Sequence, residues 1–230
     1  MLTIILDAST DVSTAILAID DRVVAKRSLR GRALAQLHLC IRDVLREASV
    51  RMSDIQRVGV IQGPGSWTGL HVAIASAKTL AQVYRLPLIP ISFIDALAFS
   101  CQEHKGYLVA IYNSPNGNIF SRSYEASGSR IVPKTEHQKL VTSELIAMLR
   151  EIGRPIRLVG GISDETAYEI ENSGVPDITF EHISYPSEAA MARIVNEAPC
   201  EGKSIQEMIF LEPLYMQSAD EGPRLFRYRK

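Results

Sequence analysis

The sequence predicts an α/β protein of two lobes, each with a mixed sheet flanked by helices. Short apolar runs that suit buried strands alternate with segments whose apolar residues recur every three or four positions, as on one face of a helix. The order of three strands, a helix, a strand and a helix occurs twice, beginning near residue 2 and again near residue 107. We therefore expect an N-terminal lobe over 1–100 and a C-terminal lobe over 101–230.

The first lobe is expected to begin antiparallel. Residues 2–6 form a nearly continuous apolar run, typical of a central strand that is buried on both faces. Polar turns separate this run from two further strand-like segments, so hairpins are predicted. The elements that follow are a helix over 34–48, a strand over 57–61, a helix from 69 to about 85, and a linker over 87–106 with a helical run near 93–100.

The second lobe repeats this order. A buried strand is predicted over 107–112, and Asn116-Gly117 is a strong hairpin signal because both residues tolerate positive φ. The remaining expected elements are strands over 118–125 and from 130 to 132, a helix over 143–152, a strand over 156–159 and a helix over 164–173.

The charge balance argues against a protein that binds nucleic acid strongly on its own. Lys and Arg number 25 and Asp and Glu number 26, giving a net charge of −1, whereas neutralising many phosphates normally requires a basic excess. A local basic cluster near the C-terminus is the exception, and it consists of Arg224, Arg227, Arg229 and Lys230.

The cysteines indicate a reducing compartment, and the apolar runs indicate a chain that does not cross a membrane. Cys40, Cys101 and Cys200 are odd in number and far apart, so they suggest no disulfide framework. The N-terminus lacks the pattern of a signal peptide, and no stretch reaches the roughly 18 to 20 apolar residues of a membrane span. A cytoplasmic protein is expected.

The most informative string is Gly-Pro-Gly-Ser-Trp-Thr-Gly at 63–69, which opens a predicted helix. Glycines let backbone amides approach an anion, and a helix start attracts one, so a phosphate site is one interpretation. Its candidate residues are Gly63, Gly65, Ser66 and Thr68, together with Asp7 after the first strand. The alternative is a sharp turn in which Ser66 or Thr68 caps the helix. Leu70 stands where a Walker lysine would follow the last glycine.

The helix after this string carries few charges. Between residues 70 and 84 the only fixed charge is Lys78, and a helix that is apolar nearly all round is buried on more than one side. Burial within this chain is one explanation, and a pairing surface shared with the 34–48 stripe is the other. The predicted interface residues are Leu34, Leu37, Ile41, Val44, Leu45, Ala73, Ile74, Ala77 and Leu80.

Signals for catalysis are weak. Histidine pairs with zinc-site spacing and a Gly-x-Ser-x-Gly elbow do not occur in the sequence. Asp7 ends the first strand where an acid could hold a metal–nucleotide complex, but a lone Asp after a strand is more often a turn former. We therefore expect no catalytic residue, no bound metal and no cofactor.

Three strings in order resemble the bacterial TsaB (YeaZ) family. They are Leu-Asp-Ala-Ser-Thr at 6–10, the glycine string at 63–69, and Glu-Pro-Leu-Tyr-Met at 212–216. The resemblance implies the actin-like/Hsp70-like (ribonuclease H-like) fold with two duplicated lobes. Departures from the family pattern are Trp67 for the usual Phe, His71 for a common Arg, and Tyr112-Asn113-Ser114 for a common Asp-Ala-Arg string.

The resemblance also implies a function. TsaB proteins act in making N6-threonylcarbamoyladenosine at position 37 of tRNAs that read ANN codons, as non-catalytic scaffolds for the paralogue TsaD, with the ATPase TsaE. The implied partners are thus TsaD and TsaE, a second copy of this chain when it is alone, and tRNA only through the complex. The alternatives are an actin-like small-molecule kinase or ATPase and, with less support, a peptidase.

Overall fold

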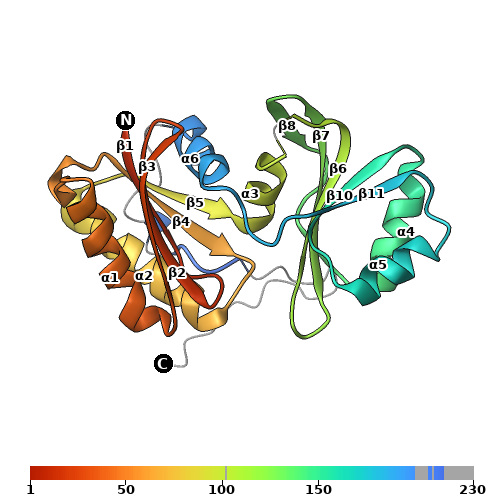
Figure 1. Ribbon diagram of the computed structural model, residues 1–230, viewed down its shortest axis with the longest axis horizontal. Helices are drawn as coiled ribbons and strands as arrows, with labels where there is room; N and C mark the ends of the chain where they lie inside the picture. The colour runs from red at the N-terminus through yellow and green to blue at the C-terminus, as the bar shows by residue number, and fades with distance from the viewer. Residues whose placement is uncertain (102, 200–206, 209, 215–230) are drawn as a thin grey trace. The chain divides into compact units, whose positions relative to one another are not determined.

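The computed structural model describes residues 1–101, 103–199, 207–208 and 210–214, and they divide into two compact units (Figure 1). Unit 1 contains Met1–Cys101 and the described part of Tyr185–Leu214, and unit 2 lies between Gln102 and Ser184. The chain thus returns to unit 1 after Ser184, whereas the sequence placed everything after residue 100 in a second lobe. Among the described residues, no helix is long and apolar enough to cross a membrane.

The sheet of unit 1 has five strands in the order β3-β2-β1-β4-β5. Strands β1, β2 and β3 pair antiparallel, and β4 and β5 continue the sheet parallel to β1. Helices α1 and α2 cover one face, and α3 and α6 cover the other (Figure 1). The bounds are β1 Leu2–Asp7, β2 Val12–Ile19, β3 Arg22–Arg30, α1 Ala33–Glu47, a 3-10 turn Met52–Asp54, β4 Arg57–Gly63, α2 Trp67–Tyr84, β5 Leu88–Ser92, α3 Phe93–Phe99 and α6 Glu188–Glu197.

The sheet of unit 2 has the same topology, in the order β11-β10-β6-β7-β8, with β9 paired to β7. Strand β6 takes the place of β1, because it pairs antiparallel with β7 and parallel with β10. The predicted α/β fold with two similar lobes is therefore confirmed. The bounds are β6 Lys105–Asn113, β7 Ile119–Ser127, β8 Arg130–Pro133, β9 Gln138–Leu140, α4 Thr142–Ile152, β10 Ile156–Gly161, α5 Asp164–Glu171 and β11 Ile178–His182.

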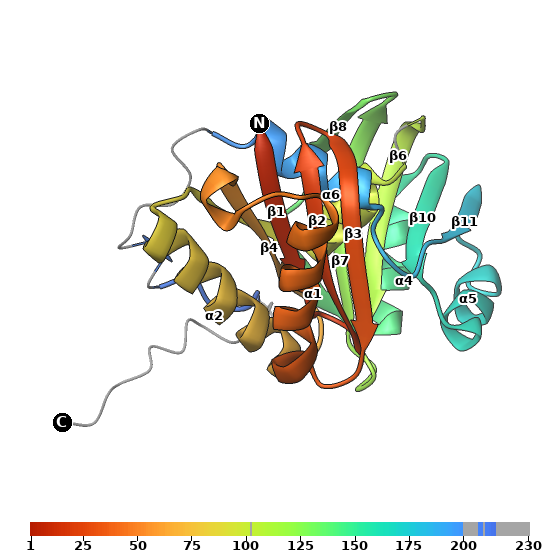
Figure 2. The same ribbon diagram turned by 60° about the vertical axis from the view of Figure 1, so that its left-hand side comes forward.

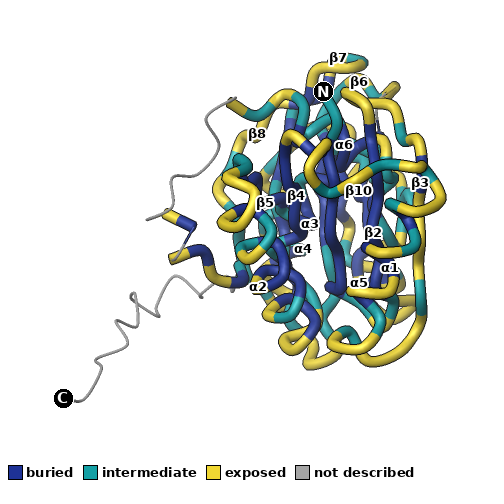
Figure 3. Tube along the Cα trace, turned by 90° about the vertical axis from the view of Figure 1, so that its left-hand side faces the viewer, coloured by how far each residue is buried: buried dark blue, intermediate teal, exposed yellow. Residues whose placement is uncertain are grey.

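The core of unit 1 lies on the central strands. Strands β1, β2 and β4 are buried along nearly their whole length, while the edge strand β3 is mostly exposed (Figure 3). This matches the continuous apolar run predicted for the first strand, since a strand covered by helices on both faces needs apolar residues at every position.

Several elements were missed from the sequence. The predicted linker over 87–106 contains β5, whose Pro90 is tolerated because β5 is an edge strand that, among the described strands, pairs with β4 alone. The sequence also gave no strand at β9 or β11 and no helix at α6. The sequence does contain an N-cap residue for α6, Ser187. In the structure its hydroxyl accepts a hydrogen bond from the Ala190 amide.

Helix α6 is fixed to the middle of the unit 1 sheet by β4. The Arg57 side chain is fully buried, and its Nη1 donates to the carbonyl oxygens of Val195 at 2.7 Å and Ala198 at 3.0 Å. These carbonyls lie at the C-terminal end of α6, where a cation is favoured by the helix dipole. Two residues along β4, Gly59 leaves room for Val195, since a Cβ atom on Gly59 would lie 2.7 Å from Val195 Cγ2.

The close packing of α6 on β4 can be tested with Gly59→Ala. The added methyl group forces α6 away from the sheet, and we expect a loss of about 1–3 kcal/mol in the free energy of unfolding, the usual cost of overpacking. Gly161→Ala is the control, because the nearest heavy atom to its new methyl group lies 4.0 Å away. Urea unfolding of both variants measures the difference, and equal stability of the two would contradict the packing described.

Candidate functional site

Asp7 is a buried carboxylate whose two oxygens are both occupied. It lies at the end of β1 and is 1% exposed. Its Oδ1 accepts from the Ser9 amide at 2.7 Å, and its Oδ2 accepts from the Tyr185 hydroxyl at 2.5 Å. Burial raises the pKa of Asp7 above its ordinary value, while the bonds from Tyr185 and Ser9 act in the opposite direction. The sequence predicted Asp7 as a site residue but gave no sign of Tyr185.

The glycine string packs against the turn that follows Asp7. A Cβ atom on Gly65 would lie 2.6 Å from the Ser9 oxygen, and one on Gly69 would lie 1.8 Å from the Ala8 oxygen. The Ser66 amide also donates to the Ser9 carbonyl at 2.6 Å. These glycines are therefore required by the close approach of two backbone segments, whatever else the string does.

The rest of the string begins α2. The Ser66 hydroxyl accepts from the Gly69 amide at 3.3 Å, which is the N-cap given above as one of the two alternatives. Thr68 is exposed in the first helical turn. The structure thus brings Asp7, Gly65 and Ser66 to one end of the sheet, with the Ala8–Ser9 turn packed between β1 and the string.

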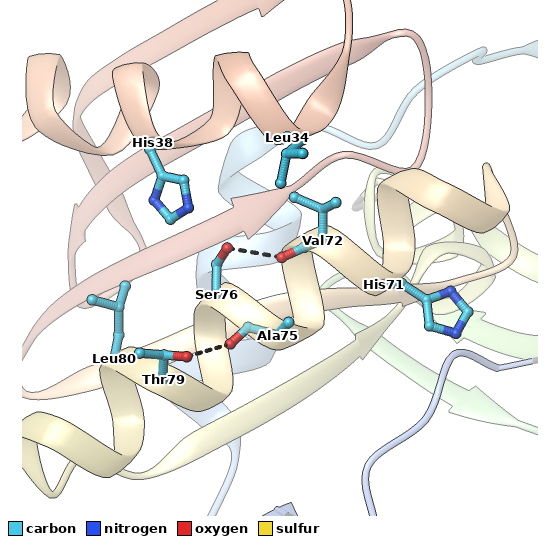
Figure 4. Close-up of a pocket in the computed structure, with 8 residues that line it drawn as sticks. All are labelled: Leu34, His38, His71, Val72, Ala75, Ser76, Thr79 and Leu80. Atoms are coloured by element: carbon cyan, nitrogen blue, oxygen red, sulfur yellow. Dashed lines mark hydrogen bonds between the residues drawn. The ribbon is translucent and has the colours of Figure 1, made fainter.

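A groove of about 520 Å³ lies between α1 and α2 (Figure 4). Leu34 and His38 point from α1 toward α2, and Leu34 is 72% exposed. None of the residues that line the groove carries a fixed charge. They are Leu34, His38, His71, Val72, Ala75, Ser76, Thr79 and Leu80.

The hydroxyl groups in the groove are satisfied by their own helix. Ser76 donates to the Val72 carbonyl at 2.8 Å, and Thr79 donates to the Ala75 carbonyl at 2.9 Å (Figure 4). Because these polar groups are already paired, the groove presents a mainly apolar surface. Other large apolar side chains on α2 are also exposed, with Trp67 at 63% and Val83 at 67%. Exposed apolar surface of this kind is typical of a protein-binding site.

Most of the predicted interface residues face the sheet instead of the groove. Six of the nine are buried in the core of unit 1, namely Leu37, Ile41, Val44, Ala73, Ile74 and Ala77. Leu45 and Leu80 are half-buried, and Leu34 is exposed. The helical stripe that the sequence revealed is therefore the one that holds α1 and α2 on the sheet. Leu34 and Leu80 are the two predicted residues that line the groove.

A second cavity of about 520 Å³ belongs to unit 2, at the ends of β6 and β10. It is lined by polar residues that include Asn113, Ser114 and Thr166, and by the carboxylates of Glu165 and Glu169. Its lining contains neither Lys nor Arg. The lack of a cation together with two carboxylates disfavours a phosphate ligand here.

The part of the chain that the structure describes contains no candidate metal site. No group of three or more His, Cys, Asp or Glu side chains is placed to hold a metal ion there. Cys40 and Cys101 are buried, while Cys200 and the basic cluster over 224–230 lie outside the described residues.

A protein-family model matches most of the sequence of this chain. The model described as "TsaD: tRNA N6-adenosine threonylcarbamoyltransferase" matches residues 32–181. A protein of Bacillus subtilis named tRNA threonylcarbamoyladenosine biosynthesis protein TsaB is 24% identical over 189 residues, which cover 78% of this chain and 81% of that protein. The chain belongs to the TsaD family, in its TsaB (YeaZ) branch.

Matches to the transferases themselves are local. The tRNA N6-adenosine threonylcarbamoyltransferase of Ligilactobacillus salivarius is 42% identical over 59 residues, which are 26% of this chain and 17% of that enzyme. The likeness to TsaB extends over far more of both sequences, so the chain groups with TsaB within the family.

Solved structures place the fold in the same group. YeaZ from Pseudomonas aeruginosa superposes with a TM-score of 0.74 at 18% identity, covering 94% of this chain and 99% of that one. A second structure from the same species, described as similar to peptidase YEAZ, gives a TM-score of 0.77 at 19% identity, with the same coverage of both chains. A ROK hexokinase from Thermus thermophilus superposes less closely, with a TM-score of 0.50 at 12% identity, covering 84% of this chain and 96% of that one. The actin-like fold expected from the TsaB resemblance is confirmed.

The raised pKa of Asp7 predicts a specific pH dependence of stability. The folded state holds the Asp7 proton more tightly than the unfolded chain, so the contribution of Asp7 is fully present below about pH 4 and is lost as the pH rises through the folded pKa. Asp7→Asn keeps an acceptor for the Ser9 amide and has no such loss. We expect the melting temperature of the variant minus that of the parent to increase from about pH 4 to about pH 8. A difference that is constant across this range would show that Asp7 is not perturbed.

Proposed function

We propose that this chain is a non-catalytic scaffold subunit in the synthesis of tRNA N6-threonylcarbamoyladenosine, pairing with a TsaD homologue and with the ATPase TsaE. The family and the name of the Bacillus subtilis relative support the pathway. The observation that carries the scaffold role is the apolar groove between α1 and α2, since it is an exposed surface suited to protein binding.

The environment of Asp7 supports the absence of catalysis. An ATP site needs a metal-holding acid and several donors that face the phosphates. Both oxygens of Asp7 accept hydrogen bonds, and one of the donors is the hydroxyl of Tyr185, a half-buried residue. A metal at Asp7 would compete with the Tyr185 hydroxyl and the Ser9 amide for the lone pairs of a buried carboxylate. This disfavours the alternative of an actin-like kinase or ATPase.

The groove is the surface we assign to the TsaD homologue. Large apolar side chains at an interface supply binding energy when a partner removes them from water, and Leu34 is mostly exposed in this chain. Since none of the eight lining residues has a fixed charge, a partner can cover the groove without burying an unpaired ion. When no partner is present, we expect two copies of this chain to pair through the same groove.

A charge placed in the groove tests this assignment. Ala75 is exposed, lies on α2 and lines the groove, so Ala75→Glu keeps the helix while a carboxylate would be buried on pairing. We expect its affinity for the TsaD homologue of the same organism to fall at least about 100-fold, as measured by calorimetry. The homodimer of the isolated chain should also shift to monomer in light scattering.

The matched control is Gln82→Glu, which adds the same charge at an exposed position of the same helix outside the groove. It should bind the partner as the parent does, and both variants should melt within a few degrees of it. Unchanged binding by Ala75→Glu with an intact fold would exclude the groove. No binding of the TsaD homologue by the parent chain would reject the scaffold function itself.

Nucleotide binding separates the scaffold from the kinase alternative. We expect calorimetry of the isolated chain with ATP and Mg²⁺ to give no heat of binding up to about 1 mM nucleotide, because Asp7 is engaged by Tyr185. Tyr185→Phe is the informative variant, since it frees one oxygen of Asp7 without changing the shape of the ring. Micromolar binding by the parent, abolished by Asp7→Ala with the fold preserved, would favour the kinase.

A further inference from the structure

The charges of this chain are distributed unevenly along the sequence. Residues 22–51 contain eight Lys or Arg and two Asp or Glu, whereas the other 200 residues contain 17 Lys or Arg and 24 Asp or Glu. The net charge of −1 is therefore the balance of one basic segment and an acidic remainder. Asymmetry of this kind indicates a surface for a polyanion more directly than the overall charge does.

All eight basic side chains of this segment are exposed. Five of them follow one continuous piece of unit 1, from the second half of β3 through the connecting loop and along α1, which packs beside β3 (Figure 2). We call these five the basic strip: Arg27, Arg30, Arg32, Arg42 and Arg46.

The acidic neighbours do not balance the basic strip. Arg42 and Arg46 share one carboxylate, that of Asp43, at 2.8 and 3.5 Å. Arg32 makes no ion pair with any residue that the structure describes, although it lies between two paired arginines in the strip.

The remaining two ion pairs of the strip are exposed. Arg27 reaches Glu47 at the end of α1 at 2.8 Å, and Arg30 reaches Asp11 at 3.2 Å. The Arg30 side chain is 80% exposed and that of Arg46 is 78% exposed. Exposed pairs such as these contribute little to stability, so the guanidinium groups are available to a stronger anion.

Protection of the sheet edge explains only part of the strip. Lys and Arg on an edge strand such as β3 prevent pairing with other chains. Arg42 and Arg46 are on a helix, however, and Arg32 lies between the two elements, so edge protection does not account for them.

We propose that the basic strip binds the phosphate backbone of RNA. Arginine matches phosphate oxygens with paired donors, and half or more of the hydrogen bonds in such complexes go to the backbone. The identification of this RNA as tRNA rests on the function proposed above. The basic surface is observed independently of that function. The strip and the groove share α1, with Leu34 and His38 lining the groove and Arg42 and Arg46 lying outside its lining. A partner in the groove therefore leaves the strip beside it.

The test is direct binding of an unmodified tRNA transcript to the purified full chain, measured by fluorescence anisotropy at several salt concentrations. The strip variant combines Arg27→Gln, Arg30→Gln, Arg42→Gln and Arg46→Gln. We expect its affinity at about 50 mM salt to fall at least tenfold, and the slope of log K against log salt to shrink by about 3, as for four lost phosphate contacts.

The matched control removes four exposed basic residues from unit 2 and changes the net charge equally. It combines Lys105→Gln, Arg130→Gln, Lys134→Gln and Arg154→Gln. This control should retain the affinity and the salt slope of the parent. Equal losses of RNA affinity in the two variants would show that only the net charge matters, and would overturn the proposal. The absence of RNA binding by the parent chain would also overturn it.

Two further measurements separate this proposal from other anions and from the scaffold function. Vesicles with anionic lipid should not compete with the RNA, and competition that is lost in the strip variant would identify a membrane surface instead. The strip variant should bind the TsaD homologue normally, while Ala75→Glu should bind RNA normally. If the strip variant lost the protein partner and kept RNA, the strip would be an acidic-protein contact and the proposal would be wrong.

Discussion

Unit 1 depends on the hydrogen bonds from Arg57 to the end of α6. The chain leaves this unit after Cys101 and returns at Tyr185, and the buried guanidinium at the start of β4 joins the returning segment to the sheet. A guanidinium without partners in this core would be costly, so the position of α6 is fixed by the same contact that satisfies Arg57. The bond from Tyr185 to Asp7 secures the beginning of that segment. Asp7 thus stabilises the return of the chain through the same oxygen that accepts from Tyr185.

The strands and helices that follow a clear period were predictable from the sequence, and those held by tertiary contacts were not. Apolar runs and helical stripes identified both lobes and their common order. Strand β5 was missed because prolines normally mark a linker, and only the sheet shows that Pro90 lies on an edge. Helix α6 was missed because it is short, although its alanines favour a helix and Ser187 marks its start. Its place against Gly59 depends on residues far away in the sequence.

The groove between α1 and α2 could not be predicted from the sequence for a different reason. A helical stripe marks the face that is most apolar, and on α1 and α2 that face packs on the sheet, as the burial of Leu37 and Ala77 shows. The groove residues are mostly small or weakly polar and follow no strong period. Ser76 and Thr79 look polar in the sequence, yet their hydroxyls bond to the helix backbone and leave an apolar surface. That pairing is visible only in the folded helix.

The same limit applies to charge. An average over the whole chain argued against a nucleic-acid contact, because acidic residues elsewhere cancel the basic segment. Electrostatic attraction acts over about 10 Å at ordinary salt, so the local arrangement decides what binds and the sum over a protein does not. Helix α1 combines both surfaces, with Leu34 on its groove side and Arg42 and Arg46 outside the groove. A scaffold that docks a modifying enzyme through one side of a helix and contacts the RNA backbone through another would position the substrate without taking part in the chemistry.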